Sequence, residues 1–211
     1  KVLMTELIQR SIDGMIIAPS NHIDDLVPIL IATHIPVVFV DRPGDENADF
    51  VGIDNKKEAE NIITLFSVKP KKIVALAPIP VNVSTIQARV NGIKSSCKAS
   101  KINFSSVDLP VDQVVIDKLI KQEIDNGGDS FITLNNKCTL PVLSALKKLN
   151  IEVPKDVRLI SFDDNESFDY MKPPISALKL PITEIGLKSV ERLYERLKES
   201  KAPGEHFLLD C

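Results

Sequence analysis

Two adjacent carboxylates, Asp163 and Asp164, follow a short apolar run at residues 157–162. The run contains β-branched residues and is typical of a buried strand. In an open α/β sheet, ligands collect just beyond the carboxyl ends of the strands. A carboxylate at that point can accept two hydrogen bonds from neighbouring hydroxyl groups, as a sugar would offer them. The alternative is a turn in which an Asp side chain caps the next segment.

Three more polar residues stand at strand ends or on a helix. Asp41 ends the apolar run PVVFV, Asn135 ends the run FITLN, and Arg89 lies in a predicted helix. Each also has a simpler interpretation. Asp41 could pair with Arg42 in a turn, Arg89 could be a solvated arginine on the helix surface, and Asn135 could cap the helix that follows.

Together, these carboxylate, guanidinium and amide groups offer fixed, planar, two-pronged hydrogen bonding, which a polyol or a nucleobase requires in a mostly closed pocket. Catalysis is poorly supported, because the chain has no G-x-S-x-G elbow, no phosphate-binding loop and no dinucleotide fingerprint. Its three histidines lack the spacing of a zinc site. The sequence therefore predicts a ligand-binding site with no catalytic residue, no metal and no cofactor.

Strands alternate with helices along the chain, which predicts an α/β fold with parallel sheets. Strands are expected at residues 15–18, 36–40, 50–53, 71–78, 102–110, 129–136 and 157–162, and again near the C-terminus. Helices are expected at residues 2–12, 23–34, 56–66, 83–96, 111–125, 138–150 and 182–200, and Asp54-Asn55 are expected to open the helix at 56–66. Two extended, proline-bearing segments, residues 77–81 and 178–181, are candidate crossings between two lobes.

The composition narrows the class of protein. The 211 residues suggest one large or two small domains, and 44% of them are hydrophobic. A net charge of −3 with scattered lysines leaves no electrostatic footprint for nucleic acid. No apolar run approaches the length of a membrane span. Three cysteines in no pattern indicate a reducing compartment, and the start at Lys1 within a predicted helix suggests that an upstream part is missing.

Eight motifs come in the order and spacing of the lac/galactose repressor family of bacterial transcription regulators, which the chain resembles from Ile12 to about Leu209. They are DGMIIAPS, IPVVFVDRP, VGIDN, KKIVALAP, ARVNGI, VPKDVRLISFDD, PPISALKLP and EIGLKSVERL. The resemblance implies two Rossmann-like lobes with parallel sheets, joined by crossover strands around a ligand cleft, as in type I periplasmic sugar-binding proteins. It would place residues 1–78 and 182–204 in the N-terminal lobe, and residues 79–181 and 205–211 in the C-terminal lobe.

The resemblance also assigns roles to individual residues. The positions that match effector-binding residues of the family are Arg89 of R-x-x-G, Asn135 of N-D, Asp163 of F-D-D, Asp41 at the end of P-V-V-x-x-D, and Thr85 one helical turn before the arginine. The chain departs from the family at Asn136, where the motif has Asp, and at Lys69-Pro70, where the family usually has G-H. It also has no tryptophan to stack on a sugar. The identity of the effector therefore stays open.

The family resemblance implies a cytoplasmic regulator that acts as a homodimer and senses a small molecule, a sugar or a sugar derivative. Operator DNA would be bound by a helix-turn-helix domain expected upstream and absent from this sequence. Closure of the lobes on the effector would change the spacing of the two DNA-reading helices. Two alternatives remain: a periplasmic sugar-binding protein of a transporter, which would carry a secretory signal, and an α/β enzyme that uses Asp163 or Asp41.

Overall fold

The computed structural model describes residues 6, 10–19, 30, 33–44, 47–79, 83–198 and 203–211. The chain divides into two compact units. The first unit comprises Lys1–Asp54 and Pro181–Asp210, and the second comprises Asn55–Leu180 together with Cys211. Each unit has its own parallel sheet, and each is described by itself below.

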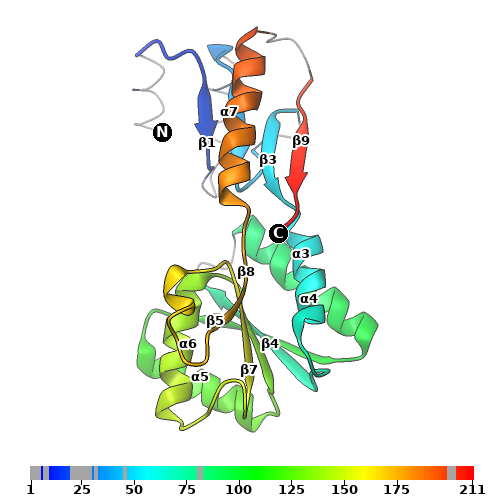
Figure 1. Cartoon of the computed structure of the whole chain (residues 1–211), viewed down its shortest axis with the longest axis vertical. Helices are drawn as coiled ribbons and strands as arrows, with labels where there is room; N and C mark the ends of the chain where they lie inside the picture. The colour runs from blue at the N-terminus through cyan, green and yellow to red at the C-terminus, as the bar shows by residue number, and fades with distance from the viewer. Residues whose placement is uncertain are drawn as a thin grey trace. The chain divides into compact units, whose positions relative to one another are not determined.

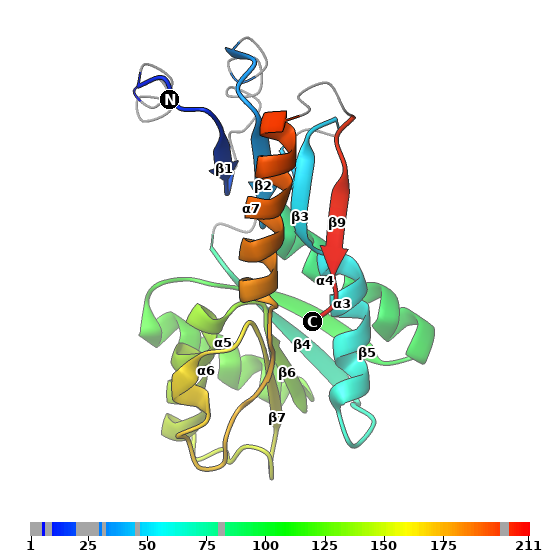
Figure 2. The ribbon, with the colours of Figure 1, turned by 45° about the horizontal axis from the view of Figure 1, so that its top comes forward.

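The first unit is built on a four-stranded parallel sheet with the order β1-β2-β3-β9. The strands are β1 (Met15–Ile17), β2 (Val37–Val40), β3 (Asp49–Ile53) and β9 (His206–Leu209). Helix α7 (Ile182–Lys198) packs along one face of this sheet, and Figures 1 and 2 show it lying across β2 and β3. A small apolar cluster that includes Met15, Phe39 and Phe50 forms the core.

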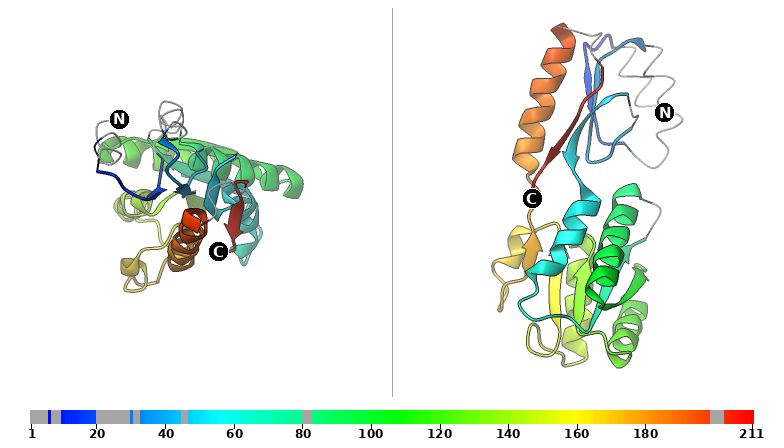
Figure 3. Two further views of the ribbon diagram at one scale, coloured as in Figure 1. Left: turned by 90° about the horizontal axis from the view of Figure 1, so that it is seen from above. Right: turned by 90° about the vertical axis from the view of Figure 1, so that its right-hand side faces the viewer.

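The second unit has a five-stranded parallel sheet with the order β5-β4-β6-β7-β8. The strands are β4 (Lys72–Pro78), β5 (Asn103–Leu109), β6 (Ser130–Thr133), β7 (Arg158–Phe162) and β8 (Ser176–Leu178). The helices are α3 (Asn55–Asn61), α4 (Ser84–Ser100), α5 (Gln113–Asp125) and α6 (Asn136–Lys148), with short 3-10 turns η2 (Ile62–Leu65) and η3 (Glu166–Phe168). Helices α3 and α4 pack against each other, and α5 packs against α6 on the other side of the sheet (Figures 1 and 3).

Strand β4 is the centre of this second sheet, with β5 on one side and β6 on the other. Its residues from Ile73 to Ala77 are completely buried. A parallel strand covered on both faces needs apolar side chains at successive positions, and this requirement explains the continuous run IVALA. Val74 and Leu76 point to the side of α5 and α6, where they join an apolar cluster with residues of both helices.

The predicted alternation of strands and helices in two parallel sheets is confirmed. The division between the lobes differs from the expected one. Strand β4 pairs within the second sheet, so the chain passes between units at Asp54–Asn55 and not at residues 77–81. The C-terminal strand β9 pairs with β3 in the first sheet, although it was expected in the other lobe. A local apolar pattern identifies a strand but does not say which sheet it joins.

The second candidate crossing, at residues 178–181, coincides with the boundary between Leu180 and Pro181. The helices expected at residues 2–12 and 23–34 fall largely outside the described residues. Among the residues that are described, no helix combines the length and the apolar character needed to cross a lipid bilayer.

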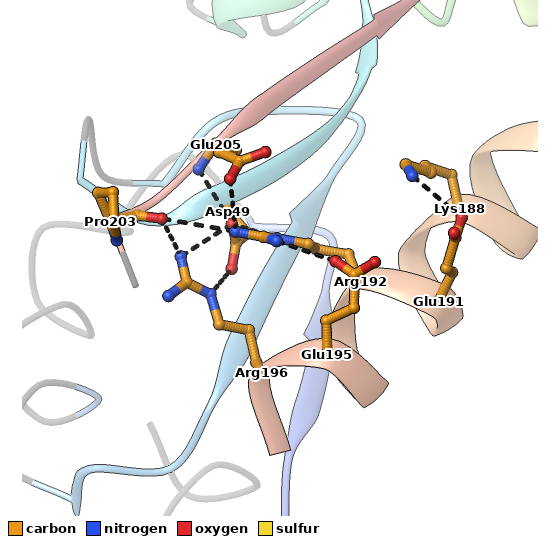
Figure 4. Close-up of polar contacts among 8 residues, drawn as sticks. All are labelled: Asp49, Lys188, Glu191, Arg192, Glu195, Arg196, Pro203 and Glu205. Atoms are coloured by element: carbon orange, nitrogen blue, oxygen red, sulfur yellow. Dashed lines mark hydrogen bonds and ion pairs between the residues drawn. The ribbon is translucent and has the colours of Figure 1, made fainter. Parts of the chain in front are cut away.

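A buried ion cluster ties α7 to the sheet of the first unit (Figure 4). Asp49, which is 1% exposed at the start of β3, accepts hydrogen bonds from Arg192 and Arg196 of α7. The backbone amide of Glu205 also donates to Asp49, at 3.0 Å, just before β9 begins. One carboxylate therefore holds together a helix and two neighbouring strands.

Burial alone would raise the pKa of the Asp49 carboxyl group, because it penalises the charged form. The hydrogen bonds from Arg196, Arg192 and the Glu205 amide outweigh burial and lower this pKa below its ordinary value of 3.8. A carboxyl group with a lowered pKa in the folded state stabilises that state fully above its ordinary pKa. The contribution is lost as the pH falls through the lowered value.

We predict that Asp49→Asn lowers the free energy of unfolding by about 3–5 kcal/mol at pH 7, since two buried guanidinium groups lose the buried carboxylate that they share. The deficit relative to the wild-type chain should shrink as the pH falls below 3.8 and through the lowered pKa of Asp49. Urea unfolding followed by far-UV circular dichroism measures both effects. Asp125→Asn, which breaks an exposed pair with Lys121, is the control and should change little. An equal effect of the two variants would contradict a structural role for the buried cluster.

Candidate functional site

The candidate site lies at the carboxyl edge of the second sheet. The chain runs from β4 to β5 on one side, then returns to β6 on the other side of β4. Such a reversal of strand order opens a crevice beyond the carboxyl ends of the strands, where ligands bind in open α/β sheets. Three predicted site residues come from elements that end or begin here: Arg89 from α4, Asn135 after β6, and Asp163 after β7.

Arg89 is buried, with 4% of its surface exposed, and its charge is compensated inside the protein. Its Nη1 donates to the Leu134 carbonyl oxygen at 2.6 Å and to Asp163 Oδ2 at 3.2 Å. Its Nη2 lies 3.1 Å from Asp163 Oδ1, so the guanidinium and the carboxylate meet side by side. The guanidinium carbon also lies 3.8 Å from the centre of the Phe162 ring, a cation–π distance. Arg89 is therefore not the solvated surface arginine that was the simpler interpretation.

Asp163 has a backbone conformation that few residues other than glycine adopt. Its φ is +69°, in the left-handed region, which Asp tolerates better than most residues. The Ser161 hydroxyl donates to the Asp163 carbonyl oxygen at 2.9 Å and holds this turn from the sheet side. Non-glycine residues in this region persist only where the surroundings determine them, and such positions cluster at ligand sites.

A chain of buried hydroxyl groups supports Ser161. The Thr139 hydroxyl lies 2.9 Å from the Ser161 hydroxyl, and the Thr133 hydroxyl lies 2.7 Å from that of Thr139. Because Ser161 gives its one proton to main-chain carbonyl oxygens, Thr139 must donate to Ser161, and Thr133 must donate to Thr139. The three strand and helix positions thus form one relay that ends at the Asp163 backbone.

Asn135 and Thr85 are the other two predicted site residues in the second unit. The Asn135 side chain accepts a hydrogen bond from the Cys138 amide at 3.1 Å and caps α6, as its simpler interpretation held. It directly follows Leu134, whose carbonyl oxygen binds Arg89. Thr85 is buried in the first turn of α4, one turn before Arg89. Contact of either residue with a ligand stays a prediction.

Asp41 lies in the first unit, at the carboxyl end of β2. Its side chain is about half exposed (49%) and accepts a hydrogen bond from Arg42 Nε at 3.1 Å. Arg42 also donates to the Pro19 carbonyl oxygen, so this pair fastens the loop after β1. The turn pairing considered for Asp41 is present. Its φ of +65° matches the left-handed backbone of Asp163.

Sequence analysis missed Asn55 as a member of the site. It begins α3 and is buried, and its Oδ1 accepts a hydrogen bond from Arg89 Nε at 2.8 Å. The motif VGIDN contains this residue, but its partner lies 34 positions further along the chain. No local pattern could have paired the two.

The protein's family follows from comparison with known sequences. Residues 65–211, well over half of the chain, match the model of the periplasmic binding protein-like domain. The chain belongs to that family. This assignment agrees with the two parallel sheets and with the position of the site at the carboxyl ends of the strands.

Individual relatives of this periplasmic binding protein-like domain are regulators by name. A probable HTH-type transcriptional regulator EndR of Paenibacillus polymyxa is 25% identical over 97% of this chain and 62% of its own length. An HTH-type transcriptional repressor PurR of Vibrio atlanticus is 26% identical over 92% of this chain and 60% of its own length. The chain thus spans about three fifths of these relatives. They confirm the resemblance to the lac/galactose repressor family.

Solved structures show the same fold. A LacI family transcriptional regulator from Enterococcus faecium with bound ribose superposes with a TM-score of 0.82 and 23% identity, covering 97% of this chain and 78% of the other. A LacI family regulator from Enterococcus faecalis, also with bound ribose, gives a TM-score of 0.84 and 20% identity, covering 99% of this chain and 78% of the other. The predicted fold, two Rossmann-like lobes of the periplasmic-binding-protein type, is confirmed.

The chemistry available at the site is recognition by hydrogen bonds. A paired guanidinium and carboxylate present donors and acceptors side by side, and their charges cancel. In the described part of the chain, no group of three or more His, Cys, Asp or Glu residues is arranged to hold a metal ion. Cys138, next to the site in sequence, is buried, and burial raises the pKa of its thiol to about 12. A thiol with this pKa stays protonated at neutral pH and is a poor nucleophile.

We predict that Thr139→Val lowers the free energy of unfolding by about 1–3 kcal/mol, since valine keeps the shape but leaves buried hydroxyl groups of the relay without a partner. Urea unfolding monitored by circular dichroism measures the change. Thr64→Val is the matched control, because the Thr64 hydroxyl makes one exposed hydrogen bond to the Asn61 carbonyl oxygen. If the two variants unfold at the same urea concentration, the relay does not stabilise the strand end at Asp163.

Proposed function

We propose that this chain is the effector-sensing core of a bacterial transcriptional regulator of the lac/galactose type. The observation that carries the proposal is the pair formed by the buried Arg89 and the partly buried Asp163 at the carboxyl edge of the second sheet. Its ligand is a small molecule, a sugar or a sugar derivative. Ligand binding controls the affinity of an upstream helix-turn-helix domain for operator DNA. A regulator of this kind acts in the cytoplasm and catalyses no reaction. The regulator names of the relatives favour this function over a transport role.

The charge balance of the site supports a neutral, hydroxylated ligand. Asp163 compensates the positive charge of Arg89, so an anionic ligand would meet no net positive charge at this pair. A sugar hydroxyl group can donate to the carboxylate and accept from the guanidinium at the same time. Two neighbouring hydroxyl groups, such as those of ribose, would bind the Asp163 carboxylate and the Arg89 guanidinium group together.

We propose that five residues bind the ligand. For Arg89, the family resemblance and the geometry of the site both support this role, and the other four are as follows. Asp163 accepts hydrogen bonds from the ligand and orients Arg89. Asn135 offers its amide group beyond the end of β6, and Thr85 its hydroxyl group from the first turn of α4. Asp41, at the end of a strand in the first unit, is proposed as a further ligand contact because it matches the family motif.

We predict that Asp163→Asn weakens binding of D-ribose at least tenfold, since a charged hydrogen bond contributes about 1.5–3 kcal/mol. Isothermal titration calorimetry and the rise in melting temperature both report the affinity. Asp156→Asn, the same change before the amino end of β7, is the control and should bind like the wild type. D-ribose 5-phosphate should bind no more tightly than D-ribose. Unchanged affinity in Asp163→Asn would contradict the site.

We further propose that the regulator works as a homodimer. Exposed apolar side chains on the second unit offer a surface for a second copy, among them Val114 on α5 and Leu140 on α6. These two helices meet where Gln113 donates to the Pro141 carbonyl oxygen at 3.0 Å. Apolar side chains gathered on a surface commonly mark a protein–protein contact.

We predict that Leu140→Glu shifts the chain from dimer to monomer, because a charge would have to be buried in the contact. Light scattering coupled to size-exclusion chromatography measures the mass. Leu65→Glu is the control, since Leu65 is equally exposed (54% against 51%) but lies in the η2 turn. A monomeric wild-type chain, or a dimer that survives Leu140→Glu, would contradict this surface.

A further inference from the structure

Asn55 joins the buried arginine of the site to the point where the chain enters the second unit. It is the first residue of that unit after the passage at Asp54, and it begins α3. Its side-chain oxygen accepts the Nε–H of Arg89 at 2.8 Å, and both side chains are buried. The peptide at the crossing is therefore one hydrogen bond away from the Arg89–Asp163 pair.

Gly92 makes this contact possible by letting α4 approach α3. A Cβ atom at Gly92 would lie 2.9 Å from the Ala59 Cβ atom, and closer still to the Lys56 carbonyl oxygen. Side chains three residues apart lie on the same face of a helix, so Arg89 and Gly92 both face α3. Gly92 and Arg89 of the motif A-R-V-N-G-I thus act together: the glycine allows the two helices to pack closely, and the arginine can then reach Asn55.

The bond to Asn55 also fixes the plane of the guanidinium group. A guanidinium group is planar, and two hydrogen bonds fix its plane here: Nε donates to Asn55, and Nη1 donates to the Leu134 carbonyl oxygen. Together they set the direction in which both Nη atoms meet Asp163. Without an acceptor at position 55, a buried N–H group of Arg89 would lose its partner. The guanidinium would then turn to satisfy it, at the expense of the pairing with Asp163.

We propose that Asn55 is a positioning residue that couples the ligand site to the crossing at Asp54–Asn55. It acts through Arg89 and does not itself touch the ligand. The proposal rests on the proposed function, in which a ligand binds at Arg89 and Asp163. A ligand that binds the pair changes the hydrogen bonds made by the Nη atoms of Arg89 and therefore the position of its guanidinium group. The hydrogen bond from Arg89 Nε to Asn55 transmits this displacement to the first turn of α3.

The first test needs no ligand. Asn55→Ser keeps a residue suited to a helix start but removes the side-chain oxygen from the reach of Arg89, while Asn55→Asp keeps the acceptor. In ¹⁵N NMR spectra, the Arg89 Nε–H proton should exchange with water at least tenfold faster in Asn55→Ser than in the wild type or in Asn55→Asp. Asn61→Ser, the same change at the other end of α3, is the control. Equal protection in Asn55→Ser and the wild type would overturn the proposal.

The second test measures the coupling. Hydrogen–deuterium exchange of a peptide spanning residues 54–61 should change at least threefold on adding D-ribose to the wild type. The change should be absent in Asn55→Ser and restored in Asn55→Asp. Asn55→Ser should also weaken D-ribose binding about tenfold, while Asn61→Ser binds normally. A ribose-dependent change in exchange that persists in Asn55→Ser would overturn the coupling.

Failure of the proposed function gives a different pattern. If D-ribose does not bind the wild type, the exchange experiment compares the wild type with Arg89→Lys in place of ribose addition. Lysine keeps the positive charge but has no Nε–H group to donate to Asn55. Arg89→Lys should then raise exchange at residues 54–61 at least threefold, and control peptides in α5 should not change. No change at residues 54–61 would overturn the coupling, whatever the ligand is.

Discussion

The second unit depends on the burial of one guanidinium group. Arg89 is 4% exposed, and an isolated buried charge would cost several kcal/mol. The four partners that offset this cost come from three separate segments: Asn55 at the start of α3, the Leu134 carbonyl oxygen after β6, and the adjacent residues Phe162 and Asp163 at the end of β7. Because these contacts lie at one sheet edge, the arginine that could bind a ligand also aligns the helices and strands around it.

The first unit solves a similar problem with the charges reversed. There, one buried carboxylate, Asp49, is shared by two arginines of α7, so the cluster carries excess positive charge. The partly exposed Glu195 and Glu205 pair with Arg192 and more than offset this excess. All of these groups have partners within the protein, and they lie at the amino end of β3, where ligands of open α/β sheets do not bind. The Asp49 cluster therefore explains how α7 is held to its sheet, whereas the Arg89 cluster is built at an edge suited to recognition.

How far the sequence predicts the structure depends on whether a feature is local. Apolar runs bounded by turn residues predicted the described strands other than β8, and the periodic segments predicted α4 to α7 to within a few residues, including α6 despite its internal Pro141. Sheet membership is not local, so β4 and β9 were expected in the wrong lobe. Asn55 was missed for the same reason. It was recognised as opening a helix, but its bond to Arg89 depends on how closely α3 and α4 pack. Arg89 and Asp163 were predicted as site residues because each stood in a recognisable motif, and the structure shows that they pair with each other.

The two strand-ending aspartates show why a motif alone does not make a site. Asp41 and Asp163 both follow a parallel strand and both have a positive φ, so their backbones turn in the same way. Asp41 pairs with the adjacent Arg42, and its side chain is 49% exposed. Asp163 is held from behind by Ser161 and from the side by a buried arginine whose own position is determined by three further contacts. Preorganisation of this kind lowers the cost of ordering side chains on binding, since the groups that meet the ligand are already in place. In the proposed function, the energetic weight of recognition therefore falls on Asp163, whose geometry is set within the second unit, and the proposed contact of Asp41 is the smaller one.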